Sequence, residues 1–116
     1  MTAVEDCLFC RVVRGEVPAQ VVHETEGTVA FRDLAPTAPT HVLVVPRAHH
    51  ADMAALASAD PALAGEVLAA ATQVAQQEGL SDGYRLVVNT GAAAGQTVFH
   101  LHVHVLGGRG LGWPPG

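Results

Sequence analysis

The stretch Thr97-Val-Phe-His-Leu-His-Val-His-Val-Leu-Gly-Gly-Arg109 places three histidines, His100, His102 and His104, at alternate positions. Aliphatic residues fill the places between them. A period of two is the period of a β-strand, in which successive side chains point to opposite faces. The β-branched valines also favour a strand, and the glycine pair ends it. The stretch therefore predicts a strand that presents the three imidazoles on one face.

The spacing of these histidines indicates that they have different functions. Alternate residues of a strand lie about 6.5 Å apart, so His100 and His104 are separated by about 13 Å. Zinc binds nitrogen at about 2 Å, which argues against one ion held by all three rings. A neutral imidazole can attack phosphorus without first losing a proton, and water can then break down the N-phosphoryl product. Position alone favours His102 as the nucleophile, with His104 and Thr97 donating to the phosphate or the leaving group.

Composition places further bounds on the function. A chain of 116 residues predicts one domain with a modest core, which a partner chain would help to stabilise. The formal charge of −5 argues against a nucleic-acid partner, although free nucleotides remain possible. No secretory leader opens the sequence, and no apolar run approaches the length of a membrane helix. We therefore expect a cytoplasmic protein with no membrane partner.

Several segments have the patterns of regular structure. Two β-rich runs flank a turn and predict a hairpin, an apolar run predicts a central strand, and a further strand precedes the glycine-containing loop at 90–96. Asp60-Pro61 predicts the start of an amphipathic helix that Gly79 closes. The four predicted strands are 20–24, 28–32, 41–46 and 84–89. His50, just past the central strand, is interpreted as a solvated loop residue.

Cys7 and Cys10 lie in a short helical turn near the N-terminus and leave three interpretations open. A thioredoxin-like redox pair needs a preceding strand that six residues cannot supply. Two small buried apolar residues need nothing more. Half of a zinc site needs two further nitrogen or sulfur ligands, and histidines are available. At the end of the hairpin, Asp33 is either a local backbone cap or a carboxylate that accepts ribose hydroxyls.

The motif His100-Leu-His-Val-His-Val-Leu-Gly-Gly-Arg109 resembles that of the histidine triad (HIT) family, in its nucleotide-binding branch. The terminal Trp113-Pro-Pro-Gly116 supports this resemblance, which extends almost end to end. Other matching segments are Phe9, Gly15-Glu-Val-Pro-Ala19, Ala30-Phe-Arg-Asp33, Ala38-Pro-Thr-His41, Gly83-Tyr-Arg85, Val88-Asn89 and Gly95-Gln96.

The resemblance implies a single HIT domain over residues 1–116. Its fold would be α+β, with an antiparallel sheet of about five strands, one long helix and one short helix. It also implies a homodimer, in which the C-terminal tail 107–116 carries Trp113 toward the partner's site. The implied activity is hydrolysis of purine nucleoside 5′-phosphoramidates through a nucleotidyl-histidine intermediate, with AMP as the type of nucleotide bound.

The resemblance also implies roles for individual residues. His102 would be the nucleophile, and His104, Thr97 and Gln96 would complete the catalytic set. Asp33 would hold the ribose hydroxyls. Residues that would enclose the base are Leu8, Phe9, Phe31 and Leu34, and those that would line the phosphate side are Asn89, Gly95, Gln96 and Thr97.

Two positions depart from what the resemblance leads us to expect. Thr97 stands where serine is expected, which keeps the hydroxyl and adds a methyl group. Cys7 and Cys10 are absent from many members of the branch. In bacterial relatives that carry such a pair, the resemblance implies one structural zinc ion per subunit, held here by Cys7, Cys10, His49 and His100.

Two alternative functions stay open at this point. Related histidine triad proteins cleave dinucleoside polyphosphates by the same chemistry. A zinc-stabilised module that binds nucleotides or a partner, with little activity, is the non-enzymatic alternative.

Overall fold

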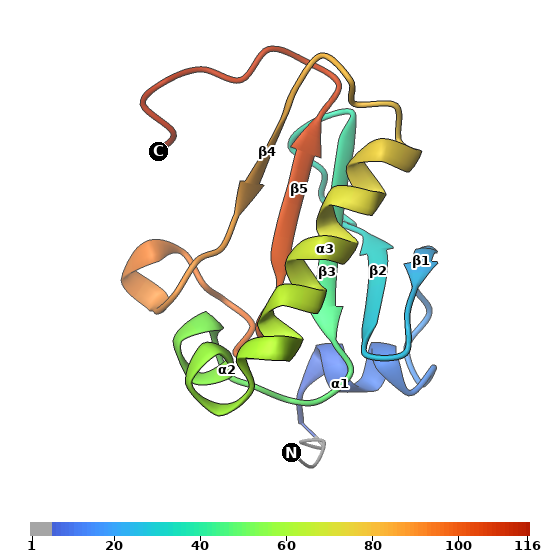
Figure 1. The fold of residues 1–116 in the computed structure, drawn as a ribbon, viewed down its shortest axis with the longest axis vertical. Helices are drawn as coiled ribbons and strands as arrows, with labels where there is room; N and C mark the ends of the chain where they lie inside the picture. Colours follow the sequence, from blue (N-terminus) through green and yellow to red (C-terminus); the bar gives the residue numbers. More distant parts are fainter. Residues whose placement is uncertain (1–5) are drawn as a thin grey trace.

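Five antiparallel strands form one sheet in the order β1-β2-β3-β5-β4 (Figure 1). The structure is a computed structural model and describes residues 6–116; residues 1–5 of the expected domain lie outside this range. The strands are β1 (Val21–Glu24), β2 (Thr28–Arg32), β3 (Thr40–Pro46), β4 (Tyr84–Val87) and β5 (Val103–Gly107). The helices are α1 (Leu8–Val13), α2 (Met53–Ala59), α3 (Pro61–Gln77) and the 3₁₀ turn η1 (Ala92–Ala94).

The architecture confirms the expected α+β fold. β1 and β2 form the predicted hairpin, and β3 lies at the middle of the sheet with every residue buried. A continuous apolar strand is suited to this central position, because both of its faces are covered. Over residues 6–116, no helix is both long enough and apolar enough to cross a membrane.

Helix α3 begins and ends where the sequence predicts. The side chain of Asp60 accepts a hydrogen bond from the backbone N–H of Leu63 at 3.1 Å, and Pro61 occupies the first helical turn. An N-cap carboxylate satisfies a backbone donor that has no partner inside the helix. Gly79, with a φ of 73°, adopts the left-handed conformation just past the end of the helix.

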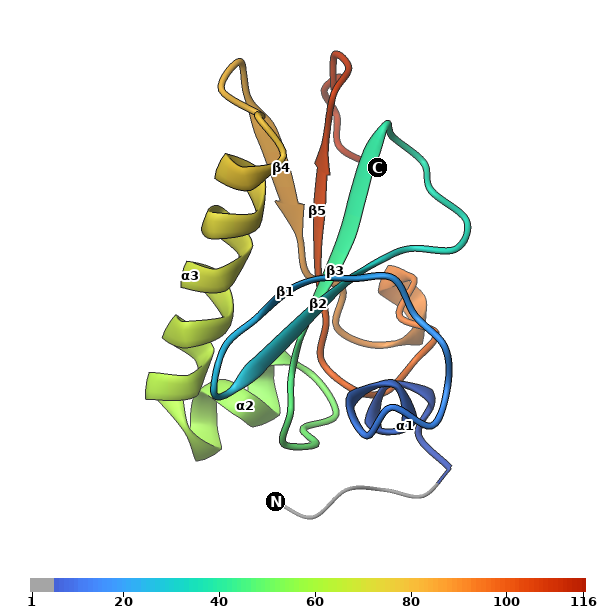
Figure 2. The same ribbon diagram turned by 90° about the vertical axis from the view of Figure 1, so that its right-hand side faces the viewer.

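The two faces of the sheet have different coverings (Figure 2). Helix α3 covers one face, where its buried residues pack against Val103 and Val105 of β5. Helix α1 lies on the opposite face, where Phe9 packs in a second cluster with Phe31 and Leu43. Because side chains alternate along a strand, β5 turns its valines toward α3 and His104 toward the other face.

The histidine strand is shorter than the sequence predicts. Strand β5 begins at Val103, so only His104 lies within it, and the segment that carries His100 and His102 is irregular. Its pairing with β3 ends at Val44 opposite Val103. Farther along β3, Pro46 has no N–H to donate, and its carbonyl accepts a hydrogen bond from His100 Nε2 at 2.8 Å. A hydrogen bond from a side chain thus replaces the backbone hydrogen bonds that would continue the pairing of β5 with β3.

Two further expectations need correction. Helix α2, capped by Asp52, is a second short helix that the sequence interpretation does not include. His50 is buried and only 6% exposed, and its carbonyl accepts the N–H of Leu101 at 2.7 Å. A backbone bond between the 50 loop and the histidine segment therefore draws His50 inward, where the sequence suggests a solvated ring.

We expect Asp60→Ala to lower the free energy of unfolding by about 1 kcal/mol, because it removes the N-cap of α3. Asp60→Asn is the matched control, since it keeps a side-chain oxygen at the same place. Urea unfolding monitored by circular dichroism measures both variants. Equal destabilisation by Ala and Asn would contradict this role for the cap.

Candidate active site and metal cluster

A cleft of about 260 Å³ lies on the α1 face of the sheet, beside His102 and His104. One part of its wall is apolar and includes Phe9 and Phe31. Asp33 contributes a carboxylate. The predicted site residues that line this cleft are Leu8, Phe9, Phe31, Asp33, Leu34, Thr97, His102 and His104.

The ring of His102 is oriented by the backbone of its own segment. Its Nδ1 lies 2.8 Å from the carbonyl oxygen of His100. A carbonyl can only accept, so Nδ1 carries the proton and Nε2 has the free lone pair. The edge of Phe9 packs on the ring, with centroids 5.0 Å apart at 87°. Burial lowers the pKa of His102, which keeps the imidazole neutral and able to act as a nucleophile at pH 7.

His104 and His41 form a pair beside His102. His41 Nε2 lies 2.9 Å from His104 Nδ1, and Asp33 Oδ2 lies 3.5 Å from the same His41 nitrogen. The rings of His102 and His104 are 5.0 Å apart. Burial lowers the pKa of His104 to about 4, so this ring is also neutral at pH 7.

The two oxygens of Asp33 have different surroundings. Oδ1 accepts the backbone N–H of Ala35 at 2.8 Å, which is the local cap that the sequence suggests as one interpretation. The carboxylate also lines the cleft. The two interpretations of Asp33 are therefore compatible, because one oxygen fixes the turn and the other can accept hydroxyl groups.

At the base of α1, the side chains of Cys7, Cys10, His49 and His100 converge. The two ring nitrogens, His49 Nδ1 and His100 Nδ1, lie 3.3 Å apart, and their contacts to the sulfurs measure 3.3 to 3.4 Å. With Zn–N of about 2.0 Å and Zn–S of about 2.3 Å, a tetrahedral ion requires about 3.3 Å between two nitrogens, about 3.5 Å between a nitrogen and a sulfur, and about 3.8 Å between two sulfurs. The four donors therefore fit a closed tetrahedral zinc site.

The state of the donors also suits a metal ion. His100 Nε2 donates to the carbonyl of Pro46, so Nδ1 carries the lone pair that faces the cluster. Burial raises the pKa of the Cys7 thiol, and the N–H of Cys10, which donates to the Cys7 sulfur at 3.4 Å, opposes that rise. These bonds place the required lone pairs inside the cluster.

The metal cluster and the cleft share two connections. His100 contributes its ring to the cluster and its carbonyl to His102. Phe9 stands between the two cysteines in sequence and packs against both His100 and His102. The cluster therefore supports the wall of the cleft and the ring of its central histidine.

Three predicted site residues of the loop before the histidines do not line the cleft: Asn89, Gly95 and Gln96. The amide of Gln96 is used by the backbone: Oε1 accepts from Gly91 N–H at 2.9 Å, and Nε2 donates to the carbonyls of Ala51 and Val98. A Cβ at Gly95 would lie 3.8 Å from Asn89 Nδ2, so these two positions are close to each other. Gln96 supports the loop that delivers Thr97 to the cleft.

Sequence reasoning gives His41 no role of its own, although the structure places it beside His104. One signal is present in the sequence: His41 alternates with Leu43 along β3, so it shares the face that meets the α1 cluster. Further lining residues that it does not single out are Val12, Val17, Pro18, Ala19, Arg32, Leu43 and Val98.

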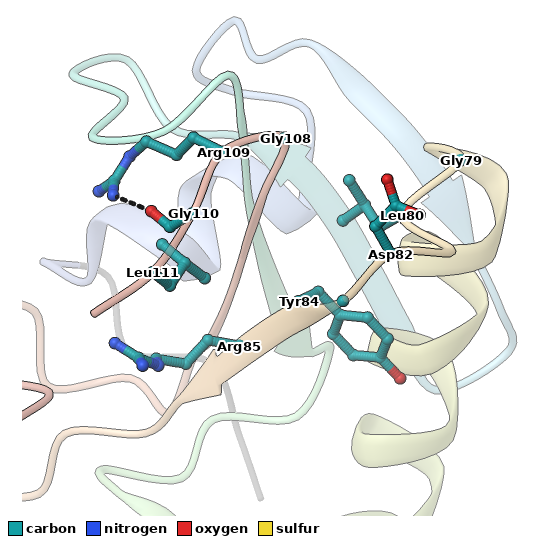
Figure 3. Close-up of a pocket in the computed structure, with 10 residues that line it drawn as sticks. Gly79, Leu80, Asp82, Tyr84, Arg85, Gly108, Arg109, Gly110 and Leu111 are labelled. Carbon is teal, nitrogen blue, oxygen red and sulfur yellow. Dashed lines mark hydrogen bonds between the residues drawn. The ribbon is translucent and has the colours of Figure 1, made fainter. Parts of the chain in front are cut away.

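A second, larger cavity of about 590 Å³ lies away from the histidines, between β4 and the C-terminal segment (Figure 3). Its wall includes Tyr84, Arg85 and Arg109. Figure 3 shows the two arginines on the side of Leu111 and Tyr84 on the opposite side. None of the metal or nucleophile candidates lies in this cavity, so its greater volume does not make it the reaction site.

Comparison with known proteins finds one matching domain family and several relatives of similar sequence and fold. The HIT domain profile matches residues 14–111. A "14 kDa zinc-binding protein" of Zea mays is 46% identical over 94% of this chain and 87% of its own length. A HIT family hydrolase from Legionella pneumophila has a TM-score of 0.92 and 47% identity, over 96% of this chain and 100% of its own. A histidine triad nucleotide-binding protein from Candida albicans has a TM-score of 0.81 and 30% identity, over 94% of this chain and 83% of its own.

The buried ring of His104 predicts a pH-dependent stability. Its pKa is lowered to about 4 in the folded chain, whereas an unfolded histidine titrates near pH 6.5. The unfolded state therefore binds more protons between these values, and the free energy of unfolding falls as the pH drops from 6.5 to 4. We expect His104→Gln to show a smaller loss over this range in urea unfolding. An unchanged pH dependence in that variant would contradict the assignment.

Proposed function

The chain belongs to the HIT domain family, and on that premise we propose that it hydrolyses the P–N bond of purine nucleoside 5′-phosphoramidates. The observation that carries the proposal is the ring of His102, whose proton is held on Nδ1 by the carbonyl of His100 while Nε2 stays free beside an open cleft. A Legionella relative described as a hydrolase and a Candida relative described as nucleotide-binding support this assignment.

The cleft offers a place for each part of such a substrate. The apolar wall of Leu8, Phe9 and Phe31 suits a purine base. The side chain of Leu34 is 96% exposed, so it is available to cover the solvent-facing side of the base. Asp33 Oδ2, which takes no part in the turn, can accept the ribose hydroxyls, and the phosphate would then lie beside the histidines. The order from base to ribose to phosphate follows the order of apolar wall, carboxylate and imidazoles.

The chemistry proceeds in two steps. His102 Nε2 attacks the α-phosphorus, the P–N bond breaks, and the amine leaves after it takes up one proton from solvent. Water then attacks the phosphorus and breaks the bond to His102; its hydroxyl joins the phosphate, and its other proton is released to solvent. His104 and Thr97 donate hydrogen bonds to the phosphoryl oxygens. Gln96 holds the loop on the phosphate side, where Asn89 and Gly95 also lie.

We propose zinc as the ion of the Cys7, Cys10, His49 and His100 cluster. The separations and lone pairs of these donors support it, and the maize relative is described as zinc-binding. Four protein ligands leave no open position, so the ion would be structural and would supply no part of the reaction. It would fix the Cys7 to Cys10 turn, and with it Phe9 against the nucleophile.

We also propose a homodimer that forms along β4. Among residues 6–116 this strand is at the edge of the sheet, so one row of its backbone groups has no strand partner within that range. Tyr84 is 41% exposed on it, and Arg85 donates to the carbonyl of Gly112 at 2.7 Å, which ties the C-terminal segment to the same edge. Gly107 is the last residue of β5, so the tail starts at Gly108. Trp113, 84% exposed, is available to a partner.

His102→Ala is expected to abolish turnover of an adenosine 5′-phosphoramidate while the Kd for AMP stays within about tenfold of the wild type, because the lost bond belongs to the reaction. Steady-state kinetics and calorimetry measure the two quantities. His23→Ala, a substitution on β1, is the control and should retain turnover. Turnover by the His102→Ala variant refutes the nucleophile. A higher kcat/KM for a dinucleoside polyphosphate than for the phosphoramidate refutes the substrate class.

Cys7→Ser is expected to remove the bound metal, because it replaces one of four ligands. Zinc present at about 100 times its Kd stabilises a fold by about 2.7 kcal/mol, and its loss should lower the Tm by about 10 °C. Elemental analysis and thermal unfolding measure the two effects. Wild-type protein purified without chelators should contain about one zinc per chain. Wild-type protein that contains no zinc would contradict the assignment.

A further inference from the structure

The backbone N–H of Thr37 determines where His41 carries its proton. It points at His41 Nδ1 from 3.1 Å, and a backbone N–H can only donate. Nδ1 of the neutral ring therefore has the lone pair, and the proton sits on Nε2. The Thr37 hydroxyl, 3.5 Å from the same nitrogen, can rotate to suit either state. The peptide donor thus selects one of the two neutral forms.

The residue that carries this donor is itself held in place through its carbonyl, which belongs to the next peptide unit. Arg109 donates to the carbonyl of Thr37 through Nη2 at 3.0 Å and Nε at 3.3 Å. His41 is 7% exposed, so water cannot easily replace the Thr37 bond. The arginine at the end of the histidine motif therefore fixes the loop that orients His41.

The proton on His41 Nε2 then determines the state of His104. The nearest acceptor is His104 Nδ1 at 2.9 Å, and Asp33 Oδ2 at 3.5 Å is the more distant alternative. A nitrogen that accepts this bond cannot carry a proton of its own, so the single proton of a neutral His104 ring lies on Nε2. That nitrogen is at the opposite side of the ring from His41, and His104 lines the cleft.

The same bonds argue against a second metal ion at this place. Asp33, His41 and His104 each offer one donor atom within 4.8 Å of the others. An ion bound at His41 Nε2 would force the ring proton onto Nδ1, where the N–H of Thr37 already points. Two hydrogens would then face each other, or the ring would have to become an anion. The group is therefore a chain of hydrogen bonds.

From these contacts we propose that His41 is a positioning residue that keeps the proton of His104 on Nε2, so that His104 donates a hydrogen bond into the cleft. The inference deepens the proposed hydrolase function and rests on it for the identity of the acceptor, a phosphoryl oxygen. His41 itself does not need to touch the substrate. A donor already oriented toward developing negative charge needs no reorganisation during the reaction.

Long-range ¹H–¹⁵N NMR of the histidine rings at pH 7.5 tests the proton positions in the wild type, without any substrate. The His104 signals are identified by their loss in His104→Gln. The expected result is a proton on Nε2 of both His41 and His104. A proton on Nδ1 of either ring, or a doubly protonated His104, overturns the proposal.

Two variants of similar size test the consequence for the reaction. His41→Gln keeps an N–H donor near His104, whereas His41→Met removes it. We expect the single-turnover rate constant of the phosphoramidate to fall about 10- to 100-fold in His41→Met and to stay within about threefold of the wild type in His41→Gln. The Kd for AMP should change less than the rate constant does.

The outcomes separate this inference from the proposed function. Equal rate constants in the two variants, whether both high or both low, overturn the role of the donor. If the wild type shows no turnover, the hydrolase proposal fails, while the proton positions are still decided by the spectra. If His41→Met does not fold, the proposal is still tested by the proton positions in the wild-type spectrum and by the rate constant of His41→Gln.

Discussion

His100 forms hydrogen bonds or donor contacts on three sides, and the arrangement of both sites depends on it. Its Nε2 donates to Pro46, its Nδ1 faces the two sulfurs, and its carbonyl accepts from His102. The side chain is completely buried, and burial lowers its pKa to about 4. A buried neutral ring whose polar atoms are all used is stable where a charged ring is not. This single residue thus joins the central strand, the cluster of four metal-ligating side chains and the ring of His102.

The sheet separates the residues that stabilise the fold from those that form the site. On the α3 face, valines of β3 and β5 form a continuous apolar core with the helix. On the other face, the alternate positions of the same strands are occupied by His41, Leu43 and His104. A chain of only 116 residues can therefore build a cleft on one side of its sheet without opening its main core. The cluster of Cys7, Cys10, His49 and His100 supports the α1 face of the sheet, where the apolar core is smaller.

The sequence predicts the elements well because their signals are local. The hairpin, the central strand and the cap of α3 each follow from a few neighbouring residues. The three histidines have different surroundings, as their spacing suggests: His100 lies in the cysteine cluster, and His102 and His104 line the cleft. Strand β5 is shorter than predicted since a long-range bond from His100 to Pro46 ends the ladder. Long-range contacts also explain the buried His50 and the inward amide of Gln96. The position of His41 depends on strand order, which no local pattern encodes.

The central claim is that His102 Nε2 forms a covalent bond with the α-phosphorus of a nucleotide. Rapid quenching of the wild-type protein during turnover of an adenosine 5′-phosphoramidate, followed by peptide mass spectrometry, measures it most directly. The account predicts an added AMP group on the peptide that contains His102, with fragment ions that place the group on that ring. A quenched reaction that proceeds at full rate without any nucleotidylated histidine, or with the group on another residue, would contradict it.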